Sequence, residues 1–93
     1  MTTTKTGYLN RIVRHCATNG GVSFKAQGEA RSRTFRDADK AIDAFAAEYT
    51  GQEMIYISHM AGRKIAATVG AEAMGDECWS LQGDEALIAL VGV

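Results

Sequence analysis

Four side chains of the types that bind zinc are spread along the sequence, namely His15, Cys16, His59 and Cys78. Structural zinc sites gather thiolates and imidazoles through short, repeated spacings, such as two cysteines separated by two to four residues. The adjacent pair His15 and Cys16 is far from both other residues, so no compact zinc pattern occurs. The sequence therefore predicts no metal site, and the two cysteines are expected to be reduced, packed thiols.

Pairs that could act as nucleophile and base are present, but their spacing separates them. Ser58 and His59 are neighbours in a strand-like segment, where successive side chains point to opposite faces. Asp39 and Asp43 share one helix face, and paired carboxylates can carry out acid–base chemistry. On an exposed helix, however, such carboxylates are usually solvated charges. No glycine loop has phosphate-binding spacing, so the sequence predicts no catalytic residue, no cofactor and no enzyme.

Charged side chains are sorted along the chain. Residues 1–36 contain seven Lys or Arg against one acidic residue, whereas residues 37–93 contain three against ten. The formal net charge of −1 hides this asymmetry. Such a division concerns the choice and approach of partners rather than the fold. It predicts two oppositely charged surfaces that another macromolecule could contact.

The acidic surface is expected on the solvent side of a helix. Its predicted contact residues are Asp37, Asp39, Asp43 and Glu48. This set would suit a partner protein with a basic surface. The alternative interpretation is that these residues are only the polar half of an amphipathic helix. Contact between the basic part of one chain and the acidic part of another, which would give a homodimer, also remains open.

A second contact is predicted on a basic hairpin. Its residues are Lys25, Arg31, Arg33 and Arg36. Arginine forks suit phosphate groups, which suggests a nucleic-acid-binding regulator as the alternative function. The same residues could instead be the solvated face of an edge strand. Because the isoelectric point is near 6.1, nucleic acid is the less favoured partner.

Hydrophobic periodicity predicts the elements that position these residues. Apolar residues at three- and four-residue steps predict helices over residues 5–18 and 37–50. Asp37 is expected to cap the second helix, and Gly51 to end it as a left-handed cap.

Alternating patterns predict strands over residues 22–26, 30–35, 53–59, 64–69 and 79–81. A loop or short helical turn is expected over residues 70–76. Residues 86–91 are predicted as a last strand, with a helix capped by Asp84 as the alternative. The expected fold is a single α+β domain covering residues 1–93, with an antiparallel sheet of four to six strands and two helices packed on one face.

The segments VSFKAQGEARSRTF, RDADKAIDAFAAEYTG and EMIYISHMAGRKIAATV follow one another as two strands, a capped helix and two strands. The chain resembles several small phage-encoded anti-CRISPR proteins in this layout, in its size and in its charged faces. The resemblance implies an inhibitor without an active site. It also implies a bacterial partner, namely a multisubunit surveillance complex whose basic, nucleic-acid-binding surface the inhibitor occupies. No individual residue is assigned by the resemblance.

The cellular location follows from the same considerations. No segment has the roughly 20 apolar residues that a membrane span requires, and the first residues lack the apolar run of a secretory signal. The expectation is a cytoplasmic protein of the bacterial host cell that has no contact with membranes.

Overall fold

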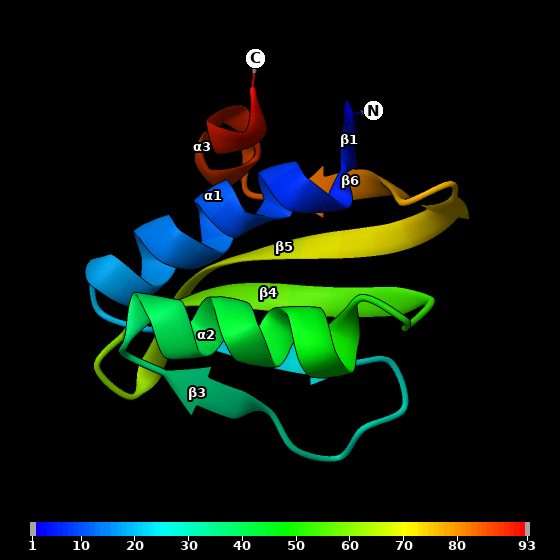
Figure 1. Cartoon of the computed structure of the whole chain (residues 1–93). Coiled ribbons are helices and arrows are strands. Elements are labelled where there is room, and N and C mark those ends of the chain that lie inside the picture. The colour runs from blue at the N-terminus through cyan, green and yellow to red at the C-terminus, as the bar shows by residue number, and fades with distance from the viewer. Residues whose placement is uncertain (1, 93) are drawn as a thin grey trace.

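The computed structural model of the chain describes residues 2–92, which form a six-stranded antiparallel sheet and three helices (Figure 1). The strands are β1 (Thr2–Lys5), β2 (Val22–Ala26), β3 (Arg33–Phe35), β4 (Met54–Ala61), β5 (Lys64–Gly75) and β6 (Cys78–Gly83). The helices are α1 (Thr6–Thr18), α2 (Ala38–Ala44, continued by the π-helical turn η1, Phe45–Tyr49) and α3 (Glu85–Ile88, continued by the 3₁₀ turn η2, Ala89–Val91). The predicted α+β class and antiparallel sheet are confirmed, with one short helix more than expected.

The strand order across the sheet is β1-β6-β5-β4-β2-β3, and all neighbours are antiparallel. The strand predicted over residues 53–59 is confirmed as β4, which is a central strand because it lies between β5 and β2 and buries Ile55 and Ile57. The two edges are formed by the short strands β1 and β3.

The hydrophobic core lies between one face of the sheet and helices α1 and α2, which cross in front of it in Figure 1. Helix α1 buries five residues of its predicted apolar stripe, Leu9, Ile12, Val13, Cys16 and Ala17, whereas Tyr8, the sixth, is exposed. Phe24 of β2 contacts three aromatic rings, with centroid distances of 5.7 Å to Phe35, 5.4 Å to Phe45 and 5.2 Å to Tyr49. This aromatic cluster fixes α2 against the sheet.

Helix α2 begins as the sequence predicts. The carboxylate of Asp37 accepts a hydrogen bond from the backbone N–H of Lys40 at 3.0 Å, which satisfies one of the free donors of the first turn. The end differs from the prediction, because Gly51 does not have the positive φ of a left-handed cap. Instead the helix widens into the turn η1, and the Thr50 N–H donates to the Phe45 carbonyl at 3.2 Å.

The prediction of a loop over residues 70–76 is wrong, because β5 continues to Gly75. It is paired with β4 as far as Glu72 and with β6 as far as Gly75. Gly70 allows the Met54 side chain of β4 to pack closely against β5, since a Cβ at position 70 would lie 2.9 Å from Cε of Met54. The turn to β6 is made by Asp76 and Glu77, whose φ values of 53° and 59° match a two-residue type I′ hairpin.

The strand predicted over residues 86–91 is also wrong, and its alternative is correct. Asp84 caps α3 by accepting from the Leu87 N–H at 3.0 Å. Leu87 and Val91 are buried, as expected for a short amphipathic helical segment on the core. Strand β1 was not predicted at all, because Thr2–Lys5 has no apolar alternation.

Within residues 2–92, every helix is too short or too polar to cross a lipid bilayer.

Candidate functional site

The predicted acidic contact residues are spread over the solvent-exposed part of α2 and η1. Asp39 is paired with Arg14 of α1 and Glu48 with Arg33 of β3, and these two elements lie on opposite sides of α2 (Figure 1). We call this set, Asp37, Asp39, Asp43 and Glu48, the acidic α2 surface, and all four residues are exposed. The opposite side of the same helix buries Ala41, Phe45 and Tyr49. The carboxylates are therefore carried by a backbone that the core holds in place.

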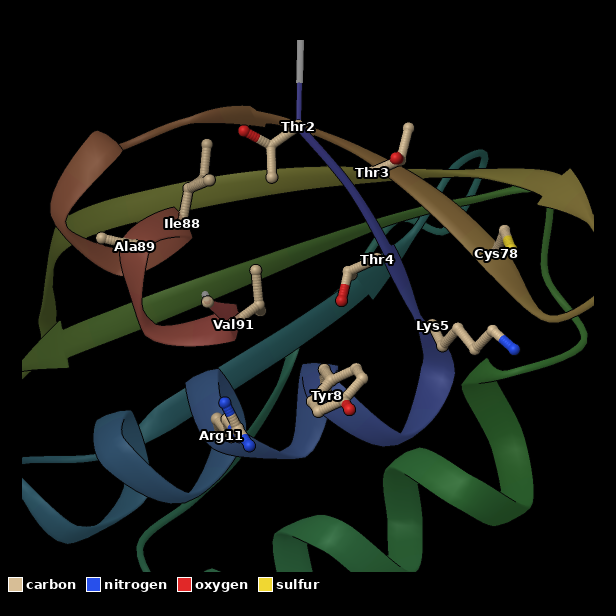
Figure 2. Close-up of a pocket in the computed structure, with 11 residues that line it drawn as sticks. Thr2, Thr3, Thr4, Lys5, Tyr8, Arg11, Cys78, Ile88, Ala89 and Val91 are labelled. Atoms are coloured by element: carbon tan, nitrogen blue, oxygen red, sulfur yellow. The ribbon is translucent and has the colours of Figure 1, made fainter.

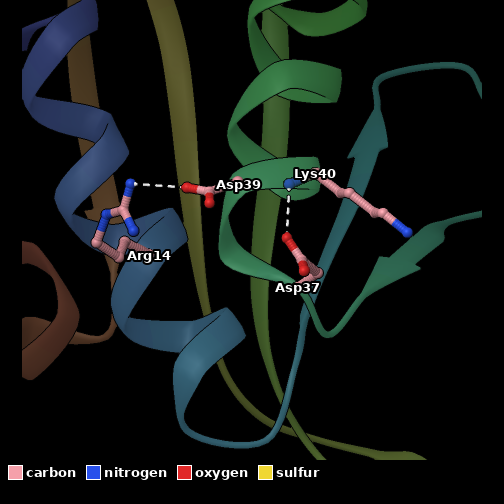
Figure 3. A network of polar contacts seen from close by, with 4 residues as sticks. All are labelled: Arg14, Asp37, Asp39 and Lys40. Carbon is pink, nitrogen blue, oxygen red and sulfur yellow. Dashed lines mark hydrogen bonds and ion pairs between the residues drawn. The ribbon is translucent and has the colours of Figure 1, made fainter.

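Basic side chains from the first part of the chain lie next to this surface. Figure 3 shows Arg14 of α1 pointing at Asp39, with 3.4 Å between Nη2 and Oδ1. The two side chains are 58% and 85% exposed, so this is a solvated ion pair. The sorting of charge along the sequence is therefore not kept in space at this point, because α1 and α2 are neighbours.

Glu48 has a basic neighbour as well. The guanidinium of Arg33 donates a hydrogen bond to its carboxylate, and this bond raises the pKa of Arg33 above its ordinary value. The same guanidinium lies 5.3 Å from the centre of the Phe35 ring. Among residues 2–92, Asp43 is the one member of the acidic α2 surface without an ion pair or a capping hydrogen bond.

The four basic residues of the predicted second contact are divided between faces. Arg33 pairs with Phe24 in the sheet and so shares its helix-covered face. Lys25 follows Phe24 in β2 and lies on the opposite face, in register with Tyr56. Arg31 precedes β3 rather than belonging to it, because that strand is shorter than predicted. Arg36 follows the strand, so these residues do not form one continuous patch.

The residues with metal-binding side chains are brought together only in part. The rings of His15 and His59 lie 5.8 Å apart, whereas Cys16 is buried in the core. His59 is engaged structurally, since its Nε2–H donates to the Asn19 carbonyl at 2.8 Å. Among residues 2–92, no three His, Cys, Asp or Glu side chains form a group that could hold a metal ion.

Ser58 and His59 lie on opposite sides of β4, as predicted. The Ser58 hydroxyl is hydrogen-bonded to the Thr68 hydroxyl at 3.0 Å and is buried. The two side chains therefore cannot act together as nucleophile and base.

The two cysteines are free thiols with different environments. Burial raises the pKa of the Cys16 thiol to about 11, and the charge of Asp84 adds to this effect. We expect a thiol reagent such as Ellman's reagent at pH 8 to titrate Cys78 in the folded protein, and Cys16 only after unfolding. Rapid reaction of two thiols in the native state would contradict this expectation.

The same shift has a consequence for stability. The folded-state pKa of Cys16 lies above its ordinary value of 9.0, so its contribution to folding is complete below pH 9 and is lost as the pH rises toward 11. Urea unfolding at pH 8 and pH 10.5 would measure this loss of unfolding free energy. A Cys16→Ala variant has no thiol at this position, so it should lack this part of the loss.

An open groove of about 970 Å³ lies at the β1 edge of the molecule (Figure 2). It is lined by Thr2, Thr3, Thr4, Lys5, Tyr8, Arg11, Cys78, Ile88, Ala89, Val91 and Gly92. In Figure 2, β1 runs along one side, Tyr8 and Arg11 lie below, and the segment α3–η2 lies opposite. Sequence reasoning missed this groove because it did not predict β1 and favoured a strand over residues 86–91.

Comparison with protein-family models, curated proteins and solved structures gave no significant match. Function is therefore inferred from the residues and their arrangement.

Proposed function

We propose that this protein is a small non-catalytic binding protein that inhibits a bacterial CRISPR surveillance complex. In this proposal the acidic α2 surface contacts a basic surface of the complex that otherwise holds nucleic acid. The bacterial partner comes from the layout resemblance, and the mode of contact comes from the charges on α2.

The observation that carries the proposal is the presence of four exposed carboxylates on a helix whose other side is packed in the core. Such a surface is already ordered before binding, so little conformational freedom is lost when a partner docks. Carboxylates at fixed positions also form charge-assisted hydrogen bonds with arginine side chains, which are common on nucleic-acid-binding surfaces.

The ion pair between Arg14 and Asp39 does not block this surface. Both side chains are more than half exposed, and exposed ion pairs of this kind contribute only ~0.2–1 kcal/mol. A basic side chain of the partner can replace Arg14 at small cost. Asp43, which has no such neighbour among residues 2–92, is available directly.

Charge reversal on α2 tests the proposal. We expect the native chain to prevent at least one purified multisubunit surveillance complex from binding its target DNA in a mobility-shift assay. The variant Asp39→Lys/Asp43→Lys should inhibit at least about tenfold more weakly, because four units of charge change on the contact surface.

The matched control is Glu53→Lys/Glu72→Lys, which changes the net charge equally at two exposed positions outside α2. This control should inhibit like the native chain, and far-UV circular dichroism should show that both variants are folded. Equal inhibition by the α2 variant and the native chain would contradict the assignment of the site. A lack of inhibition of every subtype would contradict the proposed partner.

The same assay separates this proposal from a nucleic-acid-binding regulator. Direct, salt-dependent retention of DNA or RNA by the isolated chain, lost on replacement of Arg31 and Arg33, would support the regulator instead.

A further inference from the structure

Strand β1 is an edge strand whose outer hydrogen-bonding groups face the groove region. It is paired with β6 on one side, and no strand of residues 2–92 lies on its other side. The Thr6 N–H donates to the Glu77 carbonyl at 2.9 Å, and the register continues with Thr4 opposite Trp79. Hydrogen-bonded and non-bonded pairs alternate in an antiparallel ladder. The N–H and C=O groups of Thr3 and the N–H of Lys5 therefore point away from β6, whereas the Lys5 C=O, as the N-cap of α1, accepts the first hydrogen bond of that helix.

The groove beside this edge has the form of a site for an extended chain. A strand added to β1 would continue the sheet, and every second side chain would point to its helix side. On that side the groove offers apolar groups from two elements, the ring of Tyr8 in α1 and the side chains of Ile88 and Val91 in α3 and η2. Backbone pairing would supply affinity, and this wall would select the side chains.

The charge of the groove indicates which segment fits it. Among the described residues that line it, the charged ones are Lys5 and Arg11, and none is acidic. The Arg11 guanidinium lies over the Tyr8 ring, 4.7 Å from its centre, which holds the charge beside the groove. An occupant with carboxylates would be attracted to these two cations.

A second copy of the chain fits less well than a different protein. Antiparallel pairing of two β1 strands would bring the Lys5 and Arg11 side chains of both copies to one interface. That interface would hold four cations and no acidic residue from the described lining to offset them, which opposes association.

We propose that the β1 edge and its groove bind an extended, acidic segment of a partner protein, which adds a strand to β1. The N–H and C=O of Thr3 and the N–H of Lys5 pair with the segment, while the side chains of Lys5 and Arg11 attract its carboxylates. This site is separate from the acidic α2 surface, and its test does not depend on the function proposed above.

The test uses a fluorescein-labelled peptide of eight alternating valine and glutamate residues, with binding measured by fluorescence anisotropy. A second peptide, with glutamine in place of glutamate, tests the charge. A third peptide is N-methylated at every second residue, so that all the backbone N–H groups along its pairing edge are blocked. This change removes the donors needed for strand addition. We expect the first peptide to bind and the other two to bind at least about fivefold more weakly.

Two variants of the protein locate the site. Thr3→Pro removes an outward-pointing N–H and leaves the hydrogen bonds to β6 in place, so it should weaken binding at least about fivefold. Arg11→Glu should do the same, whereas Arg63→Glu, with the same charge change in the turn between β4 and β5, should bind the peptide normally.

The outcomes separate the possible occupants. Equal binding of the N-methylated and unmethylated peptides would overturn strand addition, and it does so without any variant protein. Absence of peptide binding together with a concentration-dependent dimer that Thr3→Pro abolishes would overturn the proposal in favour of self-association. Light scattering on the native chain and on Thr3→Pro measures this second outcome.

Discussion

Replacing Trp79 by alanine is expected to unfold the protein or bring it close to unfolding. Trp79 is the largest fully enclosed side chain, with 2% of its surface exposed. Removal of a buried tryptophan costs ~3–5 kcal/mol, a large part of the ~5–15 kcal/mol that stabilises a typical domain. Urea unfolding followed by far-UV circular dichroism measures the loss, because Trp79 is the only tryptophan and its fluorescence disappears with it.

The hydrogen bond of Trp79 can be separated from its packing. The indole Nε1–H donates to the Thr6 hydroxyl at 2.8 Å, and that hydroxyl donates to the Glu77 carbonyl at 3.1 Å. Trp79→Phe keeps an aromatic ring but loses this donor, so we expect a smaller loss of about 1–3 kcal/mol. A loss below about 1 kcal/mol for Trp79→Ala would show that the β1–β6 end of the core contributes little to stability.

Gly83→Ala is expected to have an effect of similar size for a different reason. A Cβ at Gly83 would lie 2.3 Å from the Thr68 carbonyl oxygen and 3.2 Å from Cα of Val69, both of which belong to the backbone of β5. The φ of Gly83 is +123°, where a side chain also strains its own backbone. Backbone strain costs ~1–3 kcal/mol and the displacement of β5 costs ~1–3 kcal/mol, which together predict a loss of about 2–6 kcal/mol.

The control for this variant is Gly28→Ala. Gly28 also has a positive φ, of +91°, but a Cβ there would have no heavy atom within 4 Å. We expect this variant to show the backbone strain alone, ~1–2 kcal/mol. The difference between the two variants in the loss of unfolding free energy, obtained from chemical denaturation, measures the cost of the close approach of β6 to β5. Equal losses would show that the strands can move apart freely.

The elements that were predicted correctly are those whose pattern is local. Strand β2 has the predicted bounds, and helices α1 and α2 lie within one or two residues of theirs, because apolar periodicity and the Asp37 cap act over a few residues. The helices could be predicted because the same side chains that favour the helix also form its buried face.

The elements that were predicted wrongly depend on contacts between distant residues. The second half of β5 is a strand because β4 and β6 pair with it, although Gly70 and alanines do not favour strands. Ile65, which alternation placed in the core, is 62% exposed, because the register shifts at Met60 and pairs these two residues. A bulge of this kind leaves no simple signal in one sequence.

The candidate surfaces show the same limit. The sequence predicted that Asp37, Asp39, Asp43 and Glu48 lie on the solvent side of a helix, and all four are exposed, although Asp39 is paired with α1 and Glu48 with β3. It did not predict that Arg14 would reach Asp39, because the packing of α1 beside α2 brings these residues together. The groove at β1 could not be predicted from local patterns, since its lining comes from residues 2–11 and 78–92, which are far apart in the sequence.

That construction has a practical meaning for work on this protein. Thr2 and Gly92 both line the groove, so any affinity tag fused to either end is tethered within reach of it. A tether of a few residues holds an attached segment at an effective concentration of roughly millimolar. An acidic tag, such as one rich in aspartate, would then compete with added peptide, and the chain should be freed of its tag before titration.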